Sequence, residues 1–323
     1  MSIDIPNQRI KPLSIALIAI LAVVILISGY IFTASRIGAF ESCLVECSQF
    51  SSEYNDEFQL MNLNMLHGYP DFEHLPERLD LIAEQVKNIS PEFITLQEVP
   101  WTRTTRSAAR YLAEKTGMNY VYLPANGNRW TIFFTEGEAI LSKYPLKDVE
   151  FVELFPRAGF FEHRVALKTT AVSPWGKIHI VSTHLTNGDP KVNQLQAQNL
   201  YQYVSGIKDG NVIIAGDFNA TENSPQIYFL GNVWIDTYRN VNPYLPGFTC
   251  CVDYLNASPE DNILEKRIDF IFMAPDKVNP SPIVIESQRA MVLPYWVGNQ
   301  QLWASDHIAV LSKFRVLPLI DGK

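Results

Sequence analysis

A run of twenty residues without a charge, from Leu13 to Phe32, limits most strongly what the start of this chain can form. At about 1.5 Å per residue, a helix of this length spans the roughly 30 Å hydrocarbon layer of a bilayer. A cleaved signal peptide is the alternative, but its apolar stretch is usually shorter and is followed by a small-x-small site. The stretch around Thr33-Ala34-Ser35 matches such a site poorly. We therefore expect residues 13–32 to form an uncleaved transmembrane helix.

The basic residues on either side of this helix predict its orientation. Arg9 and Lys11 precede it, whereas Arg36 is the basic residue that follows it. Because Lys and Arg are more frequent on the cytoplasmic side of a membrane, the short tail at residues 1–12 is predicted to lie inside. The chain would then be a single-pass membrane protein whose large C-terminal part lies on the non-cytoplasmic side.

Four cysteines fit export but do not define a pairing. Cys43 and Cys47 fall in a polar stretch at residues 33–57, which is predicted to be a linker, and Cys250 and Cys251 are adjacent further along. Vicinal cysteines rarely bond to each other, so one bridge between linker and domain is possible, and four free thiols are the alternative. The spacing lacks the paired Cys-x₂-Cys pattern of zinc sites.

The rest of the chain, residues 58–318, has the composition of one globular domain without repeats. Hydrophobic residues make up 47% and charged residues 19% of the protein. The formal net charge is −8 and the pI is about 5.3, which argues against a broad basic face for nucleic acid. Such a charge does not exclude nucleic acid as a substrate, because a few local cations suffice to bind phosphates.

Short apolar strands outnumber helices in this domain. Strands are predicted from Phe58 onward and at 93–96, 119–123, 130–134, 138–142, 148–154, 163–172, 177–183, 211–215, 268–273, 283–286 and 307–315. Helical spacing of apolar residues predicts helices at 75–89, 104–115 and 191–204. The expected fold is α/β: a four-layered sandwich of two packed, largely antiparallel or mixed β-sheets flanked by helices, plus the N-terminal transmembrane helix.

Polar side chains cluster where the predicted strands begin or end, a place where isolated charges are costly unless they have partners. These residues are Asn64, Glu98, His184, Asp217, Asn219, Asp269, Asp306 and His307. Each has an ordinary explanation by itself; Gly-Asp-Phe-Asn, for example, favours a turn. Together, however, four carboxylates at one edge would repel one another unless a cation lay among them. Oxygen ligands with few histidines suit Mg²⁺ or Mn²⁺ rather than zinc.

Several of these residues belong to segments that resemble a known family. The segments LNMLHG, LQEV, GEAILSKYPL, STHL, GDFNA, RIDFIF and SDH, in that order, are similar to the endonuclease/exonuclease/phosphatase superfamily. That superfamily includes pancreatic-type deoxyribonucleases, abasic-site endonucleases, neutral sphingomyelinases and inositol-polyphosphate phosphatases. The resemblance extends from about Phe58 to Phe314 and implies a metal-dependent phosphoester hydrolase.

The resemblance also implies a role for each residue. Glu98 would be the principal metal ligand, assisted by Asn64, and Asp306 would contribute to the metal site or hold the neighbouring imidazole. His307 would be the general base, oriented by Asp269.

In the same resemblance, Asp217 and Asn219 would position the attacking water and a phosphate oxygen. His184 would donate a proton or a hydrogen bond to the phosphate. Arg164 matches a position that is often basic and would bind substrate, although a cross-strand surface charge explains it equally well. Glu138 departs from the family pattern, because relatives often carry Asn there.

The substrate class is less constrained than the chemistry. An anchored, acidic enzyme favours a phospholipid or sphingomyelin-like substrate, and aromatic residues at 291–297 and at Trp303 would lie beside the site, where they could contact lipid headgroups. A buried strand and a core tryptophan would explain the same residues. An exported nuclease acting on DNA or RNA is the alternative function, and a non-catalytic, membrane-tethered module that binds a phosphorylated ligand is a third. No protein partner is inferred.

Overall fold

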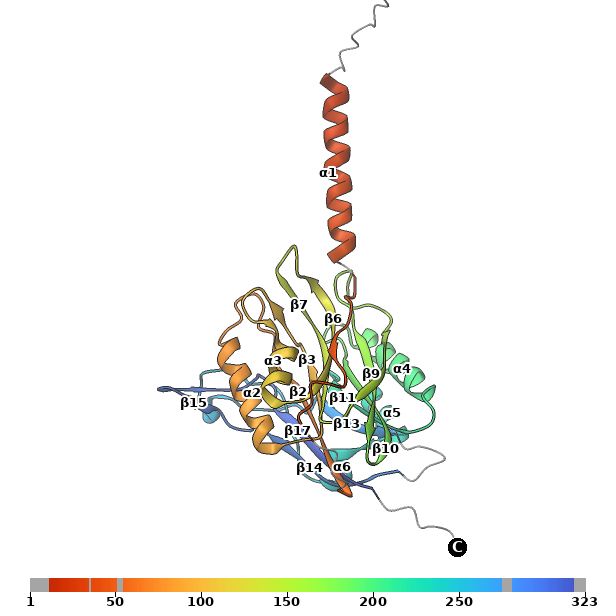
Figure 1. The fold of residues 1–323 in the computed structure, drawn as a ribbon, viewed down its shortest axis with the longest axis vertical. Coiled ribbons are helices and arrows are strands. Elements are labelled where there is room, and N and C mark those ends of the chain that lie inside the picture. Colours follow the sequence, from red (N-terminus) through yellow and green to blue (C-terminus); the bar gives the residue numbers. More distant parts are fainter. Residues whose placement is uncertain (1–11, 35, 51–54, 275–280, 317–323) are drawn as a thin grey trace, which may run out of the picture.

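The computed structural model describes residues 12–34, 36–50, 55–274 and 281–316. Two β-sheets pack face to face below a long N-terminal helix, with further helices on the outer faces of the sheets (Figure 1). This is the predicted four-layered α/β architecture. Of the predicted tail, only Pro12 is among the described residues. Residues 35 and 51–54 of the predicted linker lie outside them, as does the end of the predicted domain after residue 316.

The larger sheet has nine strands, with the main order β1-β6-β7-β3-β2-β17-β14; β4 pairs with β7, and β5 pairs with β4. Strands β2 and β3 are parallel, and the other pairs in this sheet are antiparallel. The strand bounds are β1 Glu41–Cys43, β2 Glu57–Asn64, β3 Phe93–Gln97, β4 Trp101–Thr102, β5 Arg106–Ser107, β6 Asn119–Asn128, β7 Phe134–Ser142, β14 Ile283–Ala290 and β17 Ala309–Arg315.

The smaller sheet has six strands in the order β12-β13-β11-β10-β9-β8. Only β10 and β11 are parallel in it. Its strands are β8 Leu146–Glu153, β9 Val165–Ser173, β10 Gly176–His184, β11 Asn211–Asp217, β12 Ile235–Asp236 and β13 Asp269–Ala274. A separate antiparallel hairpin joins β15 Tyr295–Val297 to β16 Gln300–Leu302.

Apolar side chains on the facing sides of the central strands explain why the two sheets pack together. One buried cluster between the sheets combines residues of both, including Leu60 and Phe93 of the larger sheet with Leu167, Ile180 and Ile213 of the smaller one. Each sheet also buries its other face against helices, and central strands are therefore apolar on both faces. Continuous burial along β3 and β7 agrees with this position.

Helices cover the two outer faces. The larger sheet packs against α2 Leu75–Ile89 and α3 Ala108–Thr116, and the smaller sheet packs against α4 Pro190–Ser205 and α5 Pro225–Val233. Ser107 caps α3 by accepting a hydrogen bond from the backbone of Arg110. Two short helices, α6 Thr237–Val241 and the 3₁₀ turn η1 Pro259–Asp261, complete the domain.

Helix α1, Pro12–Ala34, agrees with the predicted apolar segment. Its stretch Pro12–Tyr30 is long and apolar enough to cross a membrane, and none of it is buried against the protein. A buried core helix of a soluble domain would not be exposed in this way, which leaves a membrane anchor or a signal sequence. The protein therefore carries one N-terminal apolar helix of this kind among its described residues.

Several local predictions were wrong. The segments 130–134 and 138–142 were predicted as separate strands, but residues 134–142 form the single strand β7, because Gly137 continues the ladder opposite Val99 and Pro124. Helix α3 begins at Ala108, later than predicted, since the Ser107 cap sets its start. Helices α5 and α6 were not predicted, and β1 lies in the stretch expected to be a linker.

The cysteines pair differently from both sequence alternatives. Cys43 bonds to Cys47 and Cys250 bonds to Cys251, so the two pairs do not connect linker and domain. The chain turns between Cys43 and Cys47, which brings their Cα atoms to 5.9 Å, within the usual range for a disulfide. Cys250 is buried, and its backbone lies beside that of His307.

Candidate active site

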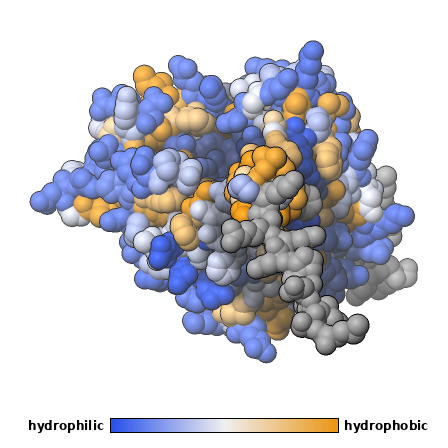
Figure 2. All heavy atoms as spheres, turned by 90° about the horizontal axis from the view of Figure 1, so that it is seen from above, coloured by the Kyte–Doolittle hydropathy of each residue, from blue (hydrophilic) through white to orange (hydrophobic). Residues whose placement is uncertain are grey.

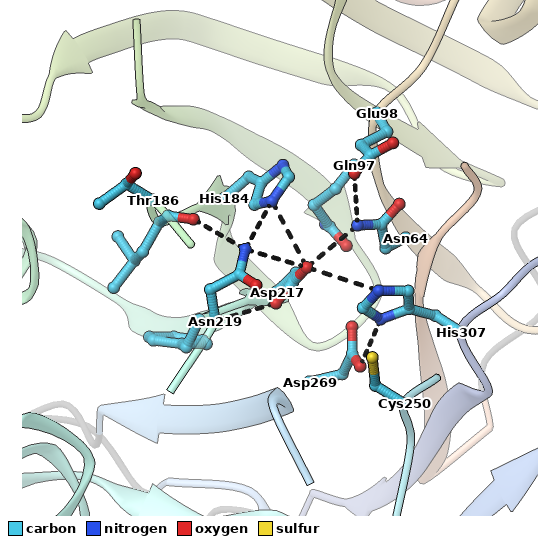
Figure 3. A network of polar contacts seen from close by, with 12 residues as sticks. Asn64, Gln97, Glu98, His184, Thr186, Asp217, Asn219, Cys250, Asp269 and His307 are labelled. Carbon is cyan, nitrogen blue, oxygen red and sulfur yellow. Dashed lines mark hydrogen bonds and ion pairs between the residues drawn. The ribbon is translucent and has the colours of Figure 1, made fainter. Parts of the chain in front are cut away.

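The ends of strands from both sheets meet at one site (Figure 3). In the smaller sheet, His184 lies opposite Asp217 and Asp217 lies opposite Asp269, so three neighbouring strands place one side chain each in a row. In the larger sheet, Asn64 and Glu98 lie at the ends of the parallel strands β2 and β3. The packing of the two sheets brings the rows together.

His307 and Asp269 form a close polar contact at the centre of the site. The His307 Nδ1 atom lies 2.8 Å from Asp269 Oδ2, and the other ring nitrogen, Nε2, lies 3.8 Å from Asp217 Oδ2. Ser305 fixes this segment, because its hydroxyl donates to the Asn64 carbonyl at 2.7 Å and accepts from the His307 amide at 3.2 Å. The imidazole is thus held by one carboxylate and directed toward another.

Asn64 connects Asp217 to Glu98. Its side-chain amide donates to Asp217 Oδ2 at 3.0 Å and to Glu98 Oε1 at 3.2 Å. Glu98 also accepts from the backbone N–H of His67 at 3.2 Å. Glu98 has a φ of 54°, in the left-handed region that is strained for this residue type, so the surrounding contacts hold its carboxylate in a fixed position.

Asn219 and His184 close the other side of the site. The Asn219 side-chain amide lies 2.9 Å from His184 Nε2 and donates to the Leu185 carbonyl at 3.0 Å. The Asn219 backbone N–H donates to Asp217 Oδ1 at 2.8 Å, and its φ of 47° is again left-handed. His184 Nε2 lies 3.4 Å from Asp217 Oδ2, so Asp217 faces both histidines.

Burial and neighbouring charges shift the pKa values in opposite directions. Burial raises the pKa of Asp217 to about 7, although the positive charge of His307 opposes this shift. Burial also acts to lower the pKa of His307, but Asp269 and Asp217 outweigh it and hold that pKa well above its ordinary value. His184 differs, because burial lowers its pKa well below the ordinary value and no carboxylate outweighs the effect. Asp269 and Asp217 thus stabilise the positive charge that His307 acquires when it accepts a proton, whereas burial favours a neutral His184.

The half-buried carboxylates Glu98 and Asp306 are the residues best suited to hold a divalent cation. Burial raises the pKa of Asp306, and the negative charge of Glu98 raises it further, as expected of two carboxylates that face a shared space. The pKa of Glu98 is lowered: burial would raise it, but His67 and the Asn64 hydrogen bond outweigh that effect. The Asn64 amide donates to Glu98 and holds this carboxylate in place. The carboxylate oxygens of Glu98 and Asp306 are ligands that suit Mg²⁺ or Mn²⁺.

A second group of possible ligands, Asp217, Asp269 and His307, also has its ligand atoms within 4.8 Å of one another. The hydrogen bond to Asp269 already occupies His307 Nδ1, which fits an oriented base better than a ligand. The Asp269 Oδ1 and His184 Nδ1 atoms are buried and have no hydrogen-bond partner within the described part of the chain. Buried polar atoms without a protein partner commonly bind a ligand, an ion or water.

Arg164 lies at the edge of the same site. Its guanidinium donates to Glu162 Oε1 at 3.0 and 2.7 Å, and its positive charge helps to lower the pKa of His184. Glu138 lies deeper, where its carboxylate accepts from Ser182 at 2.6 Å and burial raises its pKa well above the ordinary value. Burial thus favours the neutral form of Glu138, which limits the negative charge beneath the site.

Sequence reasoning missed several supporting residues. Arg78 of α2 is fully buried and donates to the carbonyls of Met65, Leu66 and Ala304, which fixes the loops that carry Asn64 and Asp306. Its position in an amphipathic helix gave no signal of this role. His67, three residues after Asn64 in LNMLHG, could have been found from the motif.

The aromatic residues that were predicted beside the site divide into two kinds. Trp303 is buried in a cluster with Leu81, Val252 and Ile308, and its indole donates to the Ala257 carbonyl at 3.0 Å. It is a core residue. Trp296 is 69% exposed on the β15–β16 hairpin, which projects from the side of the domain (Figure 1).

Comparison with known proteins agrees with this geometry. The sequence model of the Endonuclease/Exonuclease/phosphatase family matches residues 61–307, more than half of the chain. The chain belongs to this family. Members are metal-dependent phosphoester hydrolases, and the protein is therefore an enzyme of that type. The matched range contains all eight strand-end residues that the sequence singled out.

Solved structures of the family share the fold. Truncated TDP2 from Caenorhabditis elegans is 17% identical, with 80% of this chain and 98% of that chain covered and a TM-score of 0.59. A family protein from Leptotrichia buccalis is 18% identical, with 80% and 99% covered and a TM-score of 0.59. One from Bacteroides thetaiotaomicron is 14% identical, with 83% and 98% covered and a TM-score of 0.62. No curated protein matches the chain. At these identities the likeness concerns the fold.

Proposed function

We propose that this enzyme is anchored by α1 and hydrolyses a phospholipid or sphingomyelin-like phosphoester on the non-cytoplasmic side of a membrane. Two observations support the proposal. The His307–Asp269 pair faces Asp217 and the carboxylates that suit a cation, and α1 is an exposed apolar helix of membrane-spanning length. The acidic net charge of −8 also favours this substrate over a nucleic acid.

The reaction is the attack of water on phosphorus, with cleavage of the bond between phosphorus and the leaving oxygen. A divalent cation bound by Glu98, Asn64 and Asp306 would neutralise charge on the phosphate oxygens. His307 accepts the proton of the attacking water through Nε2, while Asp269 holds the ring at Nδ1 and stabilises the charge that forms. Asp217 lies next to Nε2 and fixes the position of the water.

The opposite side of the site stabilises the phosphate and the leaving group. Asn219 presents its amide beside His184, so both can donate hydrogen bonds to phosphate oxygens. Because its lowered pKa keeps His184 neutral, this imidazole acts as a hydrogen-bond donor rather than as a cation. Arg164, at the edge of the site, contributes positive charge for a phosphate group.

Two assays in buffer with Mg²⁺ test the substrate class. In the first, the full-length protein is reconstituted in vesicles of sphingomyelin or phosphatidylinositol. In the second, it is incubated with supercoiled plasmid. We expect release of the phosphorylated headgroup and intact plasmid. Nicking of the plasmid without lipid turnover would instead identify a nuclease. Turnover of no phosphoester, with retained binding of a phosphorylated ligand, would identify a binding module.

The proposed orientation of the anchor is tested by labelling intact cells. Asp56 is exposed and lies between α1 and β2, so an Asp56→Cys variant offers a thiol on the domain side of the helix. A membrane-impermeant maleimide should label it before the cells are lysed. Labelling only after lysis would place the domain in the cytoplasm and contradict the orientation.

A further inference from the structure

The chain leaves the catalytic domain toward α1 in the same direction as the β6–β7 hairpin. Strand β1 runs antiparallel to β6, with Glu41 opposite Tyr122 and Cys43 opposite Tyr120. Followed backward, the chain therefore runs along β6 toward its end, and the Gly38 amide donates to the Pro124 carbonyl at 2.8 Å. Figure 1 shows the lower end of α1 and the tip of the hairpin at the same end of the domain.

Chain length limits how far this end of the domain can be from a membrane that α1 crosses. Ala34, the last residue of α1, and Gly38 are four residues apart, so they can be separated by at most about 14 Å. From Pro124 to Asn128, β6 extends four residues further in that direction, or about 13 Å. The hairpin tip, residues 129–133, thus reaches about as far as the membrane end of the connection.

The tip carries apolar side chains that the domain leaves in solvent. Trp130 is 87% exposed, Phe133 47% and Ile132 40%. Two arginines lie at the tip: the Arg103 guanidinium lies 5.2 Å from the centre of the Phe133 ring, and Arg129 directly precedes Trp130 in the chain. Tryptophan beside arginine is typical of the boundary between lipid headgroups and acyl chains.

A second loop with exposed aromatic residues lies beside the hairpin. The segment between β8 and β9, residues 154–164, holds Phe155, Phe160 and Phe161, each more than half exposed. Asn126 of the hairpin joins the two elements, because it accepts from the His163 amide at 2.7 Å and donates to the His163 carbonyl at 3.2 Å. Viewed along α1, separate hydrophobic groups are scattered among hydrophilic ones on this face (Figure 2).

Both elements border the active site. Phe134, next to the tip, stacks on Tyr69 with ring centres 4.7 Å apart and contacts His67, which binds Glu98. On the other loop, Glu162 binds Arg164 and accepts from the Thr186 hydroxyl at 3.4 Å. The exposed aromatic residues therefore lie on the rim of the catalytic site rather than on its far side.

We infer that this rim, formed by Trp130, Ile132, Phe133, Phe155, Phe160 and Phe161, rests on the lipid surface into which α1 inserts. The catalytic site then faces the headgroups of the same membrane leaflet. This inference rests on the proposed function, in which α1 anchors the enzyme in a membrane. It adds that the anchor and the rim act together, so that the substrate reaches the site from the bilayer surface.

The six tryptophans of the protein provide a direct test, because all of them lie in the catalytic domain and none in α1. The full-length protein is reconstituted in phosphatidylcholine vesicles, with and without bromine on the lipid acyl chains, and tryptophan emission is compared. Bromine quenches only indoles that reach the lipid. The variants are Trp130→Phe and, as matched control, Trp296→Phe, since Trp296 is 69% exposed on the side of the domain.

We expect brominated lipid to reduce the tryptophan emission of the wild type. Most of this reduction should be absent from Trp130→Phe, whereas Trp296→Phe should show it in full. A wild-type emission unchanged by bromine would overturn the inference, as would a reduction that disappears in Trp296→Phe instead. The measurement needs no turnover. An enzyme without phosphoesterase activity would thus contradict the proposed function alone, and an active enzyme without quenching would contradict the inference alone.

Discussion

The His307 Nδ1 atom and the Asp269 Oδ2 atom are 2.8 Å apart, and their side chains come from different β-sheets. Asp269 begins β13 of the smaller sheet, and His307 lies two residues before β17 of the larger sheet. The pair therefore forms only when the two sheets are packed against each other. Catalysis depends on the packing of the whole sandwich and not on one local motif.

Asp269→Asn should lower kcat by about 100-fold or more, because the amide no longer stabilises the positive charge that His307 acquires. KM should change little, since Asp269 lies behind the imidazole. Combining Asp269→Asn with His307→Ala should cost no more than His307→Ala alone, as expected for residues that act as a unit. Additive losses in steady-state kinetics would contradict the pairing.

Asp217→Asn should change how stability depends on pH. Because the pKa of Asp217 is raised to about 7, the folded protein keeps a proton between the ordinary carboxyl pKa and pH 7 that the unfolded chain has released. The folded state therefore loses stability as pH rises through this window. Residue 217 of the variant cannot titrate. The free energy of unfolding of the variant, minus that of the wild type, should therefore be larger at pH 8 than at pH 5. Urea unfolding in EDTA measures this, and an equal difference at both pH values would be inconsistent with it.

Arg78→Met should destabilise the domain by about 3 kcal/mol or more, because it leaves several buried carbonyl groups without a donor. Burial lowers the pKa of Arg78 to about 10, so the guanidinium stays charged at neutral pH. For a domain of this size the midpoint of thermal unfolding should fall by roughly 6–12 °C. Lys87→Met, an exposed basic residue of the same helix, serves as control and should leave the midpoint nearly unchanged.

Glu98→Gln and Asp306→Asn should weaken divalent-cation binding by at least about tenfold, since each removes a charged oxygen ligand. Titration of Mn²⁺ followed by electron paramagnetic resonance measures binding without turnover. Asp269→Asn should bind Mn²⁺ like the wild type. If only Asp269→Asn weakened binding, the cation would belong with Asp269 and His307 instead.

Much of the site could be predicted because its residues follow strands, and strand ends are the places where apolar periodicity stops. His184, Asp217 and Asp269 were found in this way, and the structure places them on three neighbouring strands. Glu98 and His307 were found in the same way, and the order of the motifs added their expected roles. The order of the strands in the sheets, which decides whether these ends meet, cannot be found from periodicity and came from the structure.

Other features depend on contacts that local patterns do not encode. Arg78 is buried by loops from two distant segments, and Trp303 is buried by a cluster that includes Leu81 and Val252, so their burial depends on tertiary packing. The direction of β6 relative to α1 depends on the pairing of β1, which has only three residues and no periodic signal.

The hydrolysis of bis-p-nitrophenyl phosphate by the full-length protein, with and without Mg²⁺, tests the central assignment most directly. The wild type should be active only with the metal, and Glu98→Gln and His307→Ala should lose that activity. The matched controls Glu77→Gln and His74→Ala, which alter side chains at the start of α2 away from the catalytic residues, should retain it. Activity that persists in Glu98→Gln and His307→Ala at the wild-type level would contradict the account.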